Sequence, residues 1–298
     1  MNQTTVIEAP ADQAQLTQRY TREAVEFIKQ NHDQAFFLYL PHTFPHLPLF
    51  ASKEFHGKSE NGRYGDSVEE IDWSTGRILD CLARLGLTDQ TLVIFTSDNG
   101  SNGRNGGSNA PLAGNKGSTM EGGMRVPMIA RLPGVIPAQS VSSEMATMMD
   151  LLPTIGALTR AKLPETVIDG RDISSLLRGE PGAKSPHEVF YYYRRRQLQA
   201  IRWGNWKWHL PLASTYPRWN DANIKGKGRP GKLIDLKLDV REQGDVTTQH
   251  PDVIVKMKAF ADQAVRKLGD TGSQGLEQRA PRNLKQSIPL VMGQVSEA

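Results

Sequence analysis

Hydrophobic residues recur at intervals of three and four in three segments, which is the spacing of one face of an α-helix. This pattern predicts helices over residues 11–30, 66–86 and 250–268, and we expect two further helices, one over 144–158 and a short apolar one around 173–177. The first helix should end before Asn31, and Gly86 suits the end of the second. Pro153 is expected early in the third helix or at a kink within it.

Continuous apolar runs mark the expected strands. AFFLYL (35–40) and TLVIFTSDNG (91–100) have the composition of strands buried on both faces of a parallel-type sheet, and VPMIARLPG (126–134) predicts a third, short strand. After residue 185, aromatic and basic residues alternate around Gly204-Asn205, which is a turn signal between two strand-like runs. KLIDLKLD (232–239) is a further candidate strand.

The order helix, strand, loop, helix, strand indicates an α/β fold. The stretch 101–124 is rich in Gly and Asn and is expected to form an elaborate surface loop. The composition changes near residue 185. We therefore predict an α/β domain over 1–184 and a smaller α+β part over 185–298, with an antiparallel sheet, a helix and a poorly ordered tail from about residue 270.

Composition limits the class of protein. The 298 residues are 38% hydrophobic and include one cysteine, so a buried core is expected and an intramolecular disulfide is excluded. No apolar run approaches the roughly 20 residues of a membrane span, and the start of the chain lacks the features of a signal peptide. The compartment cannot be read from the chain itself.

The net charge of +4 arises from the second part, since the first part is net acidic. Arg194-Arg195-Arg196 lies close to several Tyr and Trp residues, a pattern that suits a polyanion-binding surface. The favoured interpretation is an aromatic-rich antiparallel sheet packed on the main domain, with no nucleic-acid partner.

Polar residues that could carry chemistry follow the expected strands. Asp98 and Asn99 end the second strand and offer the hard oxygen donors that calcium and magnesium prefer, although Asp-Asn-Gly is also a favourable turn sequence. Lys116, in GNKGSTMEGG, can bring an ammonium to an oxyanion. The same local sequence would also suit a mobile lysine at the surface. His46, in TFPHLPL, could be a general acid or an anion ligand, and His42 in the same loop a substrate contact.

Several other kinds of site find no support. Cys81 lies on the helix over 66–86 beside apolar neighbours and is expected to be a packing residue rather than a nucleophile. The chain has no G-x-S-x-G elbow, no H-E-x-x-H and no Cys/His zinc spacing.

Longer segments carry a family resemblance. They are, in order, AFFLYLPHTFPHLPL, YGDSVEEIDWSTGRILDCLARLGLTDQTLVIFTSDNG, GNKGSTMEGGMRVPMIARLPG, MMDLLPTIGAL, IDGRDISSLLRGE and LQAIRWGNWKWHL. Their order and spacing over roughly residues 10–270 resemble the sulfatase family, the formylglycine-dependent type I arylsulfatases of the alkaline phosphatase superfamily. The resemblance implies a partial alkaline phosphatase-like sheet flanked by helices.

The resemblance also implies roles for individual residues. Asp98 and Asn99 match two ligands of the family's metal, usually calcium; Lys116 matches the lysine that contacts the substrate sulfate. His46 matches the histidine that binds the sulfate and helps to protonate the departing alcohol. We expect Asp98, Asn99, Lys116 and His46 to surround a single anion-sized void in a sulfuric ester hydrolase.

The chain departs from the family pattern in one large respect. The family's nucleophile is a formylglycine made within a C/S-x-P-x-R motif, and no such motif occurs here. The early paired aspartates and the Lys-x-His segment are also absent. The chain therefore resembles the C-terminal portion of a sulfatase, and we expect it to be inactive alone, to have an exposed apolar face, and to need a missing N-terminal half or another subunit.

Three alternatives stay open at this point. The substrate could be a phosphate or phosphonate ester, since Lys116 and His46 would serve any tetrahedral oxyanion. The chain could instead be a non-catalytic polyanion-binding module. Its origin could be a fragment of a longer gene, a split enzyme or a degenerate paralogue.

Overall fold

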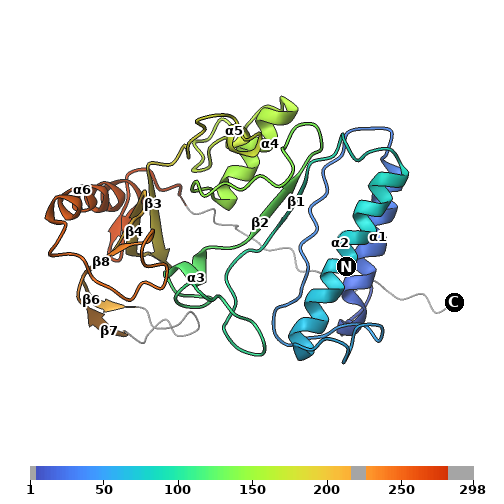
Figure 1. Ribbon diagram of the computed structural model, residues 1–298, viewed down its shortest axis with the longest axis horizontal. Helices are drawn as coiled ribbons and strands as arrows, with labels where there is room; N and C mark the ends of the chain where they lie inside the picture. The colour runs from blue at the N-terminus through green and yellow to red at the C-terminus, as the bar shows by residue number, and fades with distance from the viewer. Residues whose placement is uncertain (1–4, 216–225, 281–298) are drawn as a thin grey trace. The chain divides into compact units, whose positions relative to one another are not determined.

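The computed structural model describes residues 5–215 and 226–280. The chain divides into two compact units, one holding the residues up to Leu87 and the other running from Thr88 to Gln278. Figure 1 shows the helices and strands of each unit. Among the helices of the described ranges, none combines the length and the apolar character needed to cross a bilayer.

Two long helices form the first unit. A short 3-10 turn, η1 (Gln13–Gln15), leads into α1 (Leu16–Gln30), and α2 (Gly62–Arg84) packs along α1 (Figure 1). Both bury small and apolar residues at their contact, where Thr21 Oγ1 lies 2.6 Å from Ser74 Oγ. Both predicted helices are confirmed. Gly86 follows α2 with φ of 71°, a left-handed conformation that glycine adopts without strain.

The strand predicted over residues 35–40 is wrong. The segment has no strand geometry, and the side chains of Phe37 and Tyr39 are 69% and 74% exposed. A strand exists only where a neighbour accepts its backbone hydrogen bonds. Within the described ranges no segment pairs with residues 35–40, so the apolar run lacks the partner that would make it a strand.

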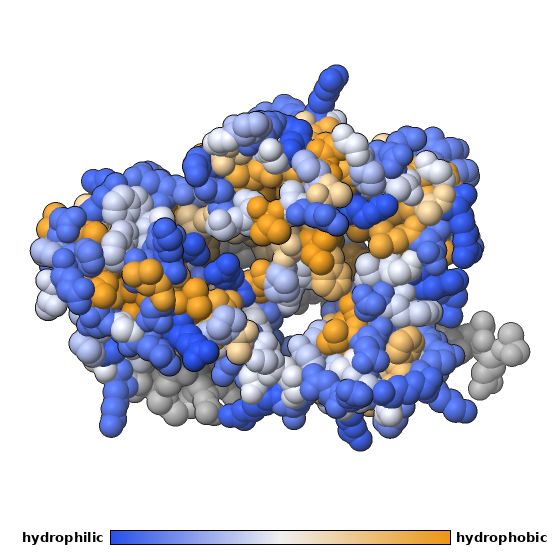
Figure 2. Space-filling model, in the orientation of Figure 1, coloured by the Kyte–Doolittle hydropathy of each residue, from blue (hydrophilic) through white to orange (hydrophobic). Residues whose placement is uncertain are grey.

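The second unit begins with a two-stranded antiparallel sheet. β1 (Val93–Thr96) pairs with β2 (Met128–Arg131), with Val93 opposite Arg131 and Thr96 opposite Met128. The strands occur where the sequence predicts them, but the expectation that the strand over 91–100 is buried on both faces of a parallel-type sheet is wrong, because β1 pairs antiparallel with β2 and its Phe95 is 40% exposed. Ile129 on β2 is 64% exposed. Figure 2 shows apolar side chains at the surface over this part of the chain.

Short helices lie between these two strands and after them in the sequence. They are α3 (Glu121–Met124), η2 (Met148–Asp150), α4 (Leu151–Thr159) and α5 (Ser174–Leu177). Pro153 lies in the first turn of α4, where its missing N–H leaves no helical hydrogen bond unmade. The helices predicted over 144–158 and 173–177 are confirmed in shortened form.

A four-stranded antiparallel sheet follows, in the order β3-β4-β5-β8. Its strands are β3 (Val189–Arg194), β4 (Gln197–Trp203), β5 (Trp206–His209) and β8 (Lys232–Asp235). The helix α6 (Pro251–Leu268) covers one face, and Leu198, Ile201 and Met257 are among the residues of the core between them (Figure 1). Trp203 and Trp206 pack against this core, which confirms the aromatic-rich antiparallel sheet.

Two small hairpins complete the described chain. β6 (Leu212–Thr215) pairs with β7 (Gly226–Arg229), and β9 (Gly269–Asp270) pairs with β10 (Ser273–Gln274). The second hairpin lies where the poorly ordered tail is predicted to begin, and residues from 281 onward fall outside the described ranges. The helices and antiparallel sheets together form an α/β fold. The domain boundary that we predict near residue 185 lies inside the second unit and stays a prediction.

Candidate functional site

The turn after β1 brings Asp98 and Asn99 together. Asp98 is exposed, and the Asn99 side-chain amide donates to Asp98 Oδ1 at 2.7 Å. The Ser97 hydroxyl closes the turn by donating to the Asn99 carbonyl at 3.1 Å. A carboxylate and a carboxamide therefore lie side by side at the end of the strand, and their oxygens are the donor type that calcium prefers.

The glycine-rich loop folds back onto this turn. The Lys116 N–H donates to the Ser101 carbonyl at 2.9 Å, and the Gly100 N–H donates to the Gly123 carbonyl at 3.2 Å. A Cβ placed on Gly100 would lie 1.8 Å from the Gly122 carbonyl oxygen, so the two backbones approach as closely as only glycine allows. Lys116 thus starts from a backbone fixed directly beside the turn that carries Asp98 and Asn99.

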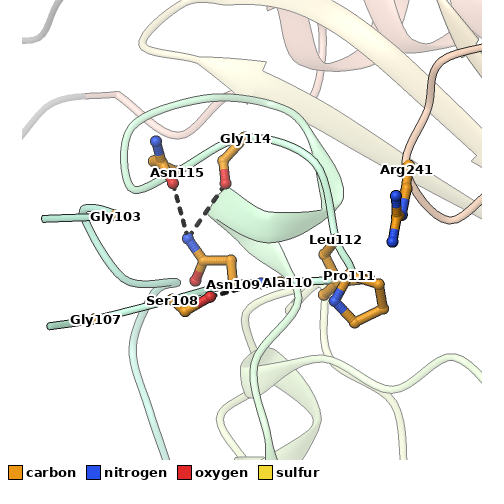
Figure 3. Close-up of a pocket in the computed structure, with 10 residues that line it drawn as sticks. All are labelled: Gly103, Gly107, Ser108, Asn109, Ala110, Pro111, Leu112, Gly114, Asn115 and Arg241. Atoms are coloured by element: carbon orange, nitrogen blue, oxygen red, sulfur yellow. Dashed lines mark hydrogen bonds between the residues drawn. The ribbon is translucent and has the colours of Figure 1, made fainter. Parts of the chain in front are cut away.

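Asn109 holds the loop in shape from within. Its Oδ1 accepts from the Ser101 N–H at 2.7 Å, and its Nδ2 lies 2.8 Å from the Ser101 carbonyl, 3.2 Å from the Gly114 carbonyl and 3.1 Å from Asn115 Oδ1. Figure 3 shows the last two of these hydrogen bonds at the wall of a pocket of about 450 Å³. Arg241 faces the pocket from another part of the chain (Figure 3). The Asn109 amide is engaged by the loop itself, so its role is to brace the loop.

A group of charged and polar residues, all buried except the partly buried Arg202, lies where the loop meets the four-stranded sheet. We call it the Glu121 cluster, and it consists of Glu121, Tyr192, Arg202, Lys207, His209 and Glu242. The Lys207 ammonium is fully buried, 2.9 Å from Glu121 Oε1 and 3.2 Å from Glu242 Oε2. The Tyr192 hydroxyl donates to Glu121 Oε1 at 2.7 Å, and Arg202 Nη1 lies 3.3 Å from Glu121 Oε2.

Glu242 is the second carboxylate of this cluster. Its Oε2 lies 2.5 Å from His209 Nε2, and its Oε1 accepts from the Glu121 N–H at 2.6 Å. Burial alone would raise the pKa of Glu242, but the hydrogen bond with His209 and the charge of Lys207 bring that pKa below its usual value. Burial holds the pKa of His209 below its usual value, against the opposing effect of Glu242. Burial and the neighbouring Glu121 carboxylate raise the pKa of Tyr192 well above 10.0.

Both regions that carry this geometry match known family models. Residues 2–161 match the model described as Sulfatase, and residues 185–287 match the model described as the C-terminal region of aryl-sulfatase. The chain belongs to the sulfatase family. Sulfatases are sulfuric ester hydrolases, and membership implies a metal and a formylglycine.

Individual relatives agree with this assignment. Human steryl-sulfatase is 45% identical over 207 residues, which cover 66% of this chain and 35% of that protein. Steryl-sulfatase of Rattus norvegicus is 44% identical over 301 residues, which cover 91% of this chain and 52% of that protein. The chain therefore spans about a third to about a half of the curated relatives named here.

The solved structures establish the fold. The PsFucS1 sulfatase from Pseudoalteromonas sp. is 28% identical and superposes with a TM-score of 0.77, over 87% of this chain and 55% of that chain. Its fold is that of the alkaline phosphatase-like sulfatases, so the predicted fold class is confirmed.

The two predicted histidines belong to the other unit of this sulfatase chain. His46 is exposed, with Nδ1 2.7 Å from the Leu47 carbonyl. A carbonyl can only accept, so Nδ1 carries a proton and Nε2 is the nitrogen left for a substrate. His42 has a buried Nδ1 that finds no hydrogen-bond partner among the described residues, and burial lowers its pKa. The convergence of His46 with Asp98, Asn99 and Lys116 stays a prediction.

The side chains present fit part of a metal site. Asp98 and Asn99 supply two oxygen ligands, whereas calcium takes 6–8. Within residues 5–215 and 226–280, no group of three or more His, Cys, Asp and Glu side chains is arranged to hold a metal. The chemistry of the donors is right for calcium and their number is too small.

Cys81 has the packing role predicted for it. It is buried on α2, and its Sγ lies 3.9 Å from the Val25 carbonyl of α1. The chain's single cysteine is therefore a small apolar filler between two helices.

The Glu121 cluster escaped the sequence analysis. One signal for it exists, because Lys207 and His209 alternate with Trp206 and Trp208 along β5, which places the two basic residues on one face of the sheet. Trp208 packs in the core beneath α6, so the opposite face must satisfy buried charge. Their partners Glu121 and Glu242 are distant in sequence, and no local pattern pairs them.

Proposed function

We propose that this chain supplies the metal-binding turn and the sulfate-binding lysine of a sulfuric ester hydrolase. The observation that carries the proposal is the hydrogen bond from the Lys116 N–H to the Ser101 carbonyl, within the residues that match the sulfatase model. This contact fixes the lysine backbone beside the turn that holds Asp98 and Asn99. An ammonium beside a metal-binding carboxylate is suited to an anion that both the metal and the ammonium can contact, such as a sulfate ester.

Asp98 and Asn99 would hold a divalent metal, and we propose calcium because both donors are hard oxygens. Bound there, the metal would draw charge from a sulfate oxygen and lower the barrier to S–O cleavage. Lys116 would bind the sulfate through its ammonium. These residues act by orienting the ester and neutralising its charge, which does not require them to form a covalent bond.

His46 would hand a proton to the departing alcohol. Since its Nδ1–H donates to the Leu47 carbonyl, the transferred proton must come from Nε2 of the protonated imidazole. His42 would be a neighbouring substrate contact, and because its Nδ1 is buried that contact would have to come from Nε2.

The nucleophile would come from a segment outside this chain, either an N-terminal half or another subunit. The family supplies a formylglycine for this purpose, and the C/S-x-P-x-R motif that yields it is absent from these 298 residues. Alone, the chain would bind the ester without cleaving it, because loss of the nucleophile removes most catalysis.

The test is calorimetric titration of the purified chain, with calcium, using an aryl sulfate. We expect Lys116→Ala to weaken binding about tenfold, the effect of losing one charge-assisted contact. Lys162→Ala is the matched control, since Lys162 has a side chain 84% exposed in an ion pair with Glu165. Equal affinity of Lys116→Ala and the unaltered chain would refute the proposal, and tighter binding of the corresponding aryl phosphate would assign the site to phosphate esters instead.

A further inference from the structure

The loop that carries Lys116 is attached to the four-stranded sheet at two buried points. The Thr119 hydroxyl donates to Gln199 Oε1 at 3.1 Å, and both residues are buried. The Glu121 N–H donates to Glu242 Oε1 at 2.6 Å, while the Glu121 carboxylate accepts from Tyr192 and Lys207. Main chain and side chain of Glu121 are thus both held by residues from the sheet and the segment after it.

Lys207 is engaged on several sides within the Glu121 cluster. Its ammonium contacts Glu121 Oε1 at 2.9 Å and Glu242 Oε2 at 3.2 Å, and it lies 4.2 Å from the centre of the Tyr192 ring. Buried ion pairs of this kind seldom raise stability above that of an apolar replacement, because their desolvation offsets their attraction. Their best-attested benefit is to specify one arrangement of the chain.

The contacts of the Glu121 cluster hold the backbone of Glu242 in an unfavourable conformation. Glu242 has φ of 51°, in the left-handed region that residues with a Cβ rarely occupy, and it is 2% exposed. Strained backbone of this sort persists only where surrounding contacts over-determine it. Here those contacts are the hydrogen bonds with His209 and from the Glu121 N–H.

The connection from Glu121 back to Lys116 is compact. The Gly122 N–H donates to the Ala113 carbonyl at 2.7 Å, and the Ser118 N–H donates to the Asn115 carbonyl at 2.9 Å. A Cβ on Gly122 would lie 2.5 Å from the Gly114 carbonyl oxygen. Residues on both sides of Lys116 are therefore in backbone contact with the segment that Glu121 anchors, and a shift of Glu121 must move them.

We propose that Glu121, Lys207 and Glu242 are positioning residues that fix the loop of Lys116 against the sheet, so that anion binding by Lys116 depends on this buried cluster. The inference rests on the proposed function in so far as Lys116 is the anion ligand. Its structural part, the fixing of residues 113–123 by the cluster, does not depend on that role.

Hydrogen exchange and sulfate titration of the full chain test the proposal together. For Glu121→Gln we expect the amides of 113–123 to exchange about tenfold faster while those of β4 and β5 keep their rates, because local opening is separable from global unfolding. The affinity for inorganic sulfate should fall by about tenfold, the consequence of a misplaced charged ligand. Glu165→Gln is the matched control, because Glu165 forms an exposed pair with Lys162.

A second variant covers the case in which a lone buried charge prevents folding. Glu121→Gln combined with Lys207→Met removes both charges and should restore the unfolding midpoint without restoring the slow exchange of 113–123. Exchange that rises equally in 113–123 and in β4–β5 would overturn the proposal, since the cluster would then only stabilise the fold. Unchanged exchange of 113–123 in both variants would overturn it as well.

A Lys116→Ala variant separates this inference from the proposed function. It should lose sulfate affinity and keep the slow exchange of 113–123. If it keeps its sulfate affinity, the proposed function fails, and the exchange data from the cluster variants still decide whether Glu121, Lys207 and Glu242 position the loop.

Discussion

Replacing Gly100 by alanine probes the close approach on which the candidate site depends. The new Cβ would lie 1.8 Å from the Gly122 carbonyl oxygen and 2.8 Å from the Gly122 carbonyl carbon. Both are backbone atoms, so no side-chain rotation can relieve the overlap, and the loop must move away from the turn after β1. Overpacking of a tight site costs typically about 1–3 kcal/mol, and we expect the upper part of that range here.

The measurement is urea-induced unfolding of the full chain followed by fluorescence, together with titration of the folded chain with inorganic sulfate. Gly76→Ala is the control, because Gly76 lies in α2 and a Cβ added there would have no atom within 4 Å. Alanine there should raise the free energy of unfolding by about 0.5–1 kcal/mol through helix propensity. If Gly100→Ala unfolds at the same urea concentration as the unaltered chain and keeps its sulfate affinity, the contact between turn and loop is not as described.

Three further predictions concern stability and solubility. Asp66→Ala should lower the free energy of unfolding by about 2–4 kcal/mol, because the carboxylate accepts backbone N–H groups of residues 57–59 at 2.8, 3.1 and 2.9 Å that would be left unpaired; a thermal midpoint within error of the unaltered chain would contradict this. The pKa values of His209 and Glu242 lie below their usual 6.5 and 4.5, so the unfolded chain binds more protons and stability should fall as the pH drops below 6.5 and again below 4.5. Unfolding free energies from pH 8 to 5 should show the first loss, to which His42 also contributes because burial lowers its pKa. His209→Gln should reduce this loss, and a slope that His209→Gln leaves intact would show that His209 does not contribute to it. Ile129→Lys, at a side chain 64% exposed on β2, should raise solubility with a change in stability within about 0.5 kcal/mol, measured by light scattering and urea unfolding, and unchanged aggregation would show that this apolar surface is not responsible.

The helices were predictable because each buries its apolar stripe against residues present in the chain. α1 and α2 pack on each other, and α6 covers a sheet built from the segment just before it. In these cases the periodicity of the sequence and the available partner agree, which is the condition for a pattern to become a structure. The hairpin turn at Gly204, with φ of 57°, follows from local sequence in the same way.

Residues 35–40 show where this reasoning stops. Their composition is that of a buried strand, but pairing is a non-local property, and no described segment offers hydrogen bonds to them. The exposure of Ile129 on β2 has the same origin, since the two-stranded sheet of β1 and β2 leaves this side chain uncovered. Apolar composition alone indicates what a segment could pack against, and the rest of the chain determines whether that partner is there.

The candidate site likewise contains residues that local sequence marks and residues that only non-local pairing brings together. Short motifs and the family resemblance mark Asp98, Asn99 and Lys116 as candidates, and their roles stay predictions. The Glu121 cluster could not, because Lys207 and Glu121 are 86 positions apart and their pairing depends on how the loop returns to the sheet. Strand alternation marks a polar face on β5 but does not say which carboxylates meet it.

Turnover of an aryl sulfate in the presence of calcium tests the central claim most directly. Alone, the 298-residue chain should release no detectable alcohol. Joined to a sulfatase segment that carries a C-x-P-x-R motif converted to formylglycine, it should release the alcohol. That turnover should be lost in Lys116→Ala. Sustained turnover by the chain alone, or turnover of the joined protein that survives Lys116→Ala, would contradict the assignment of the nucleophile or of the sulfate-binding residue.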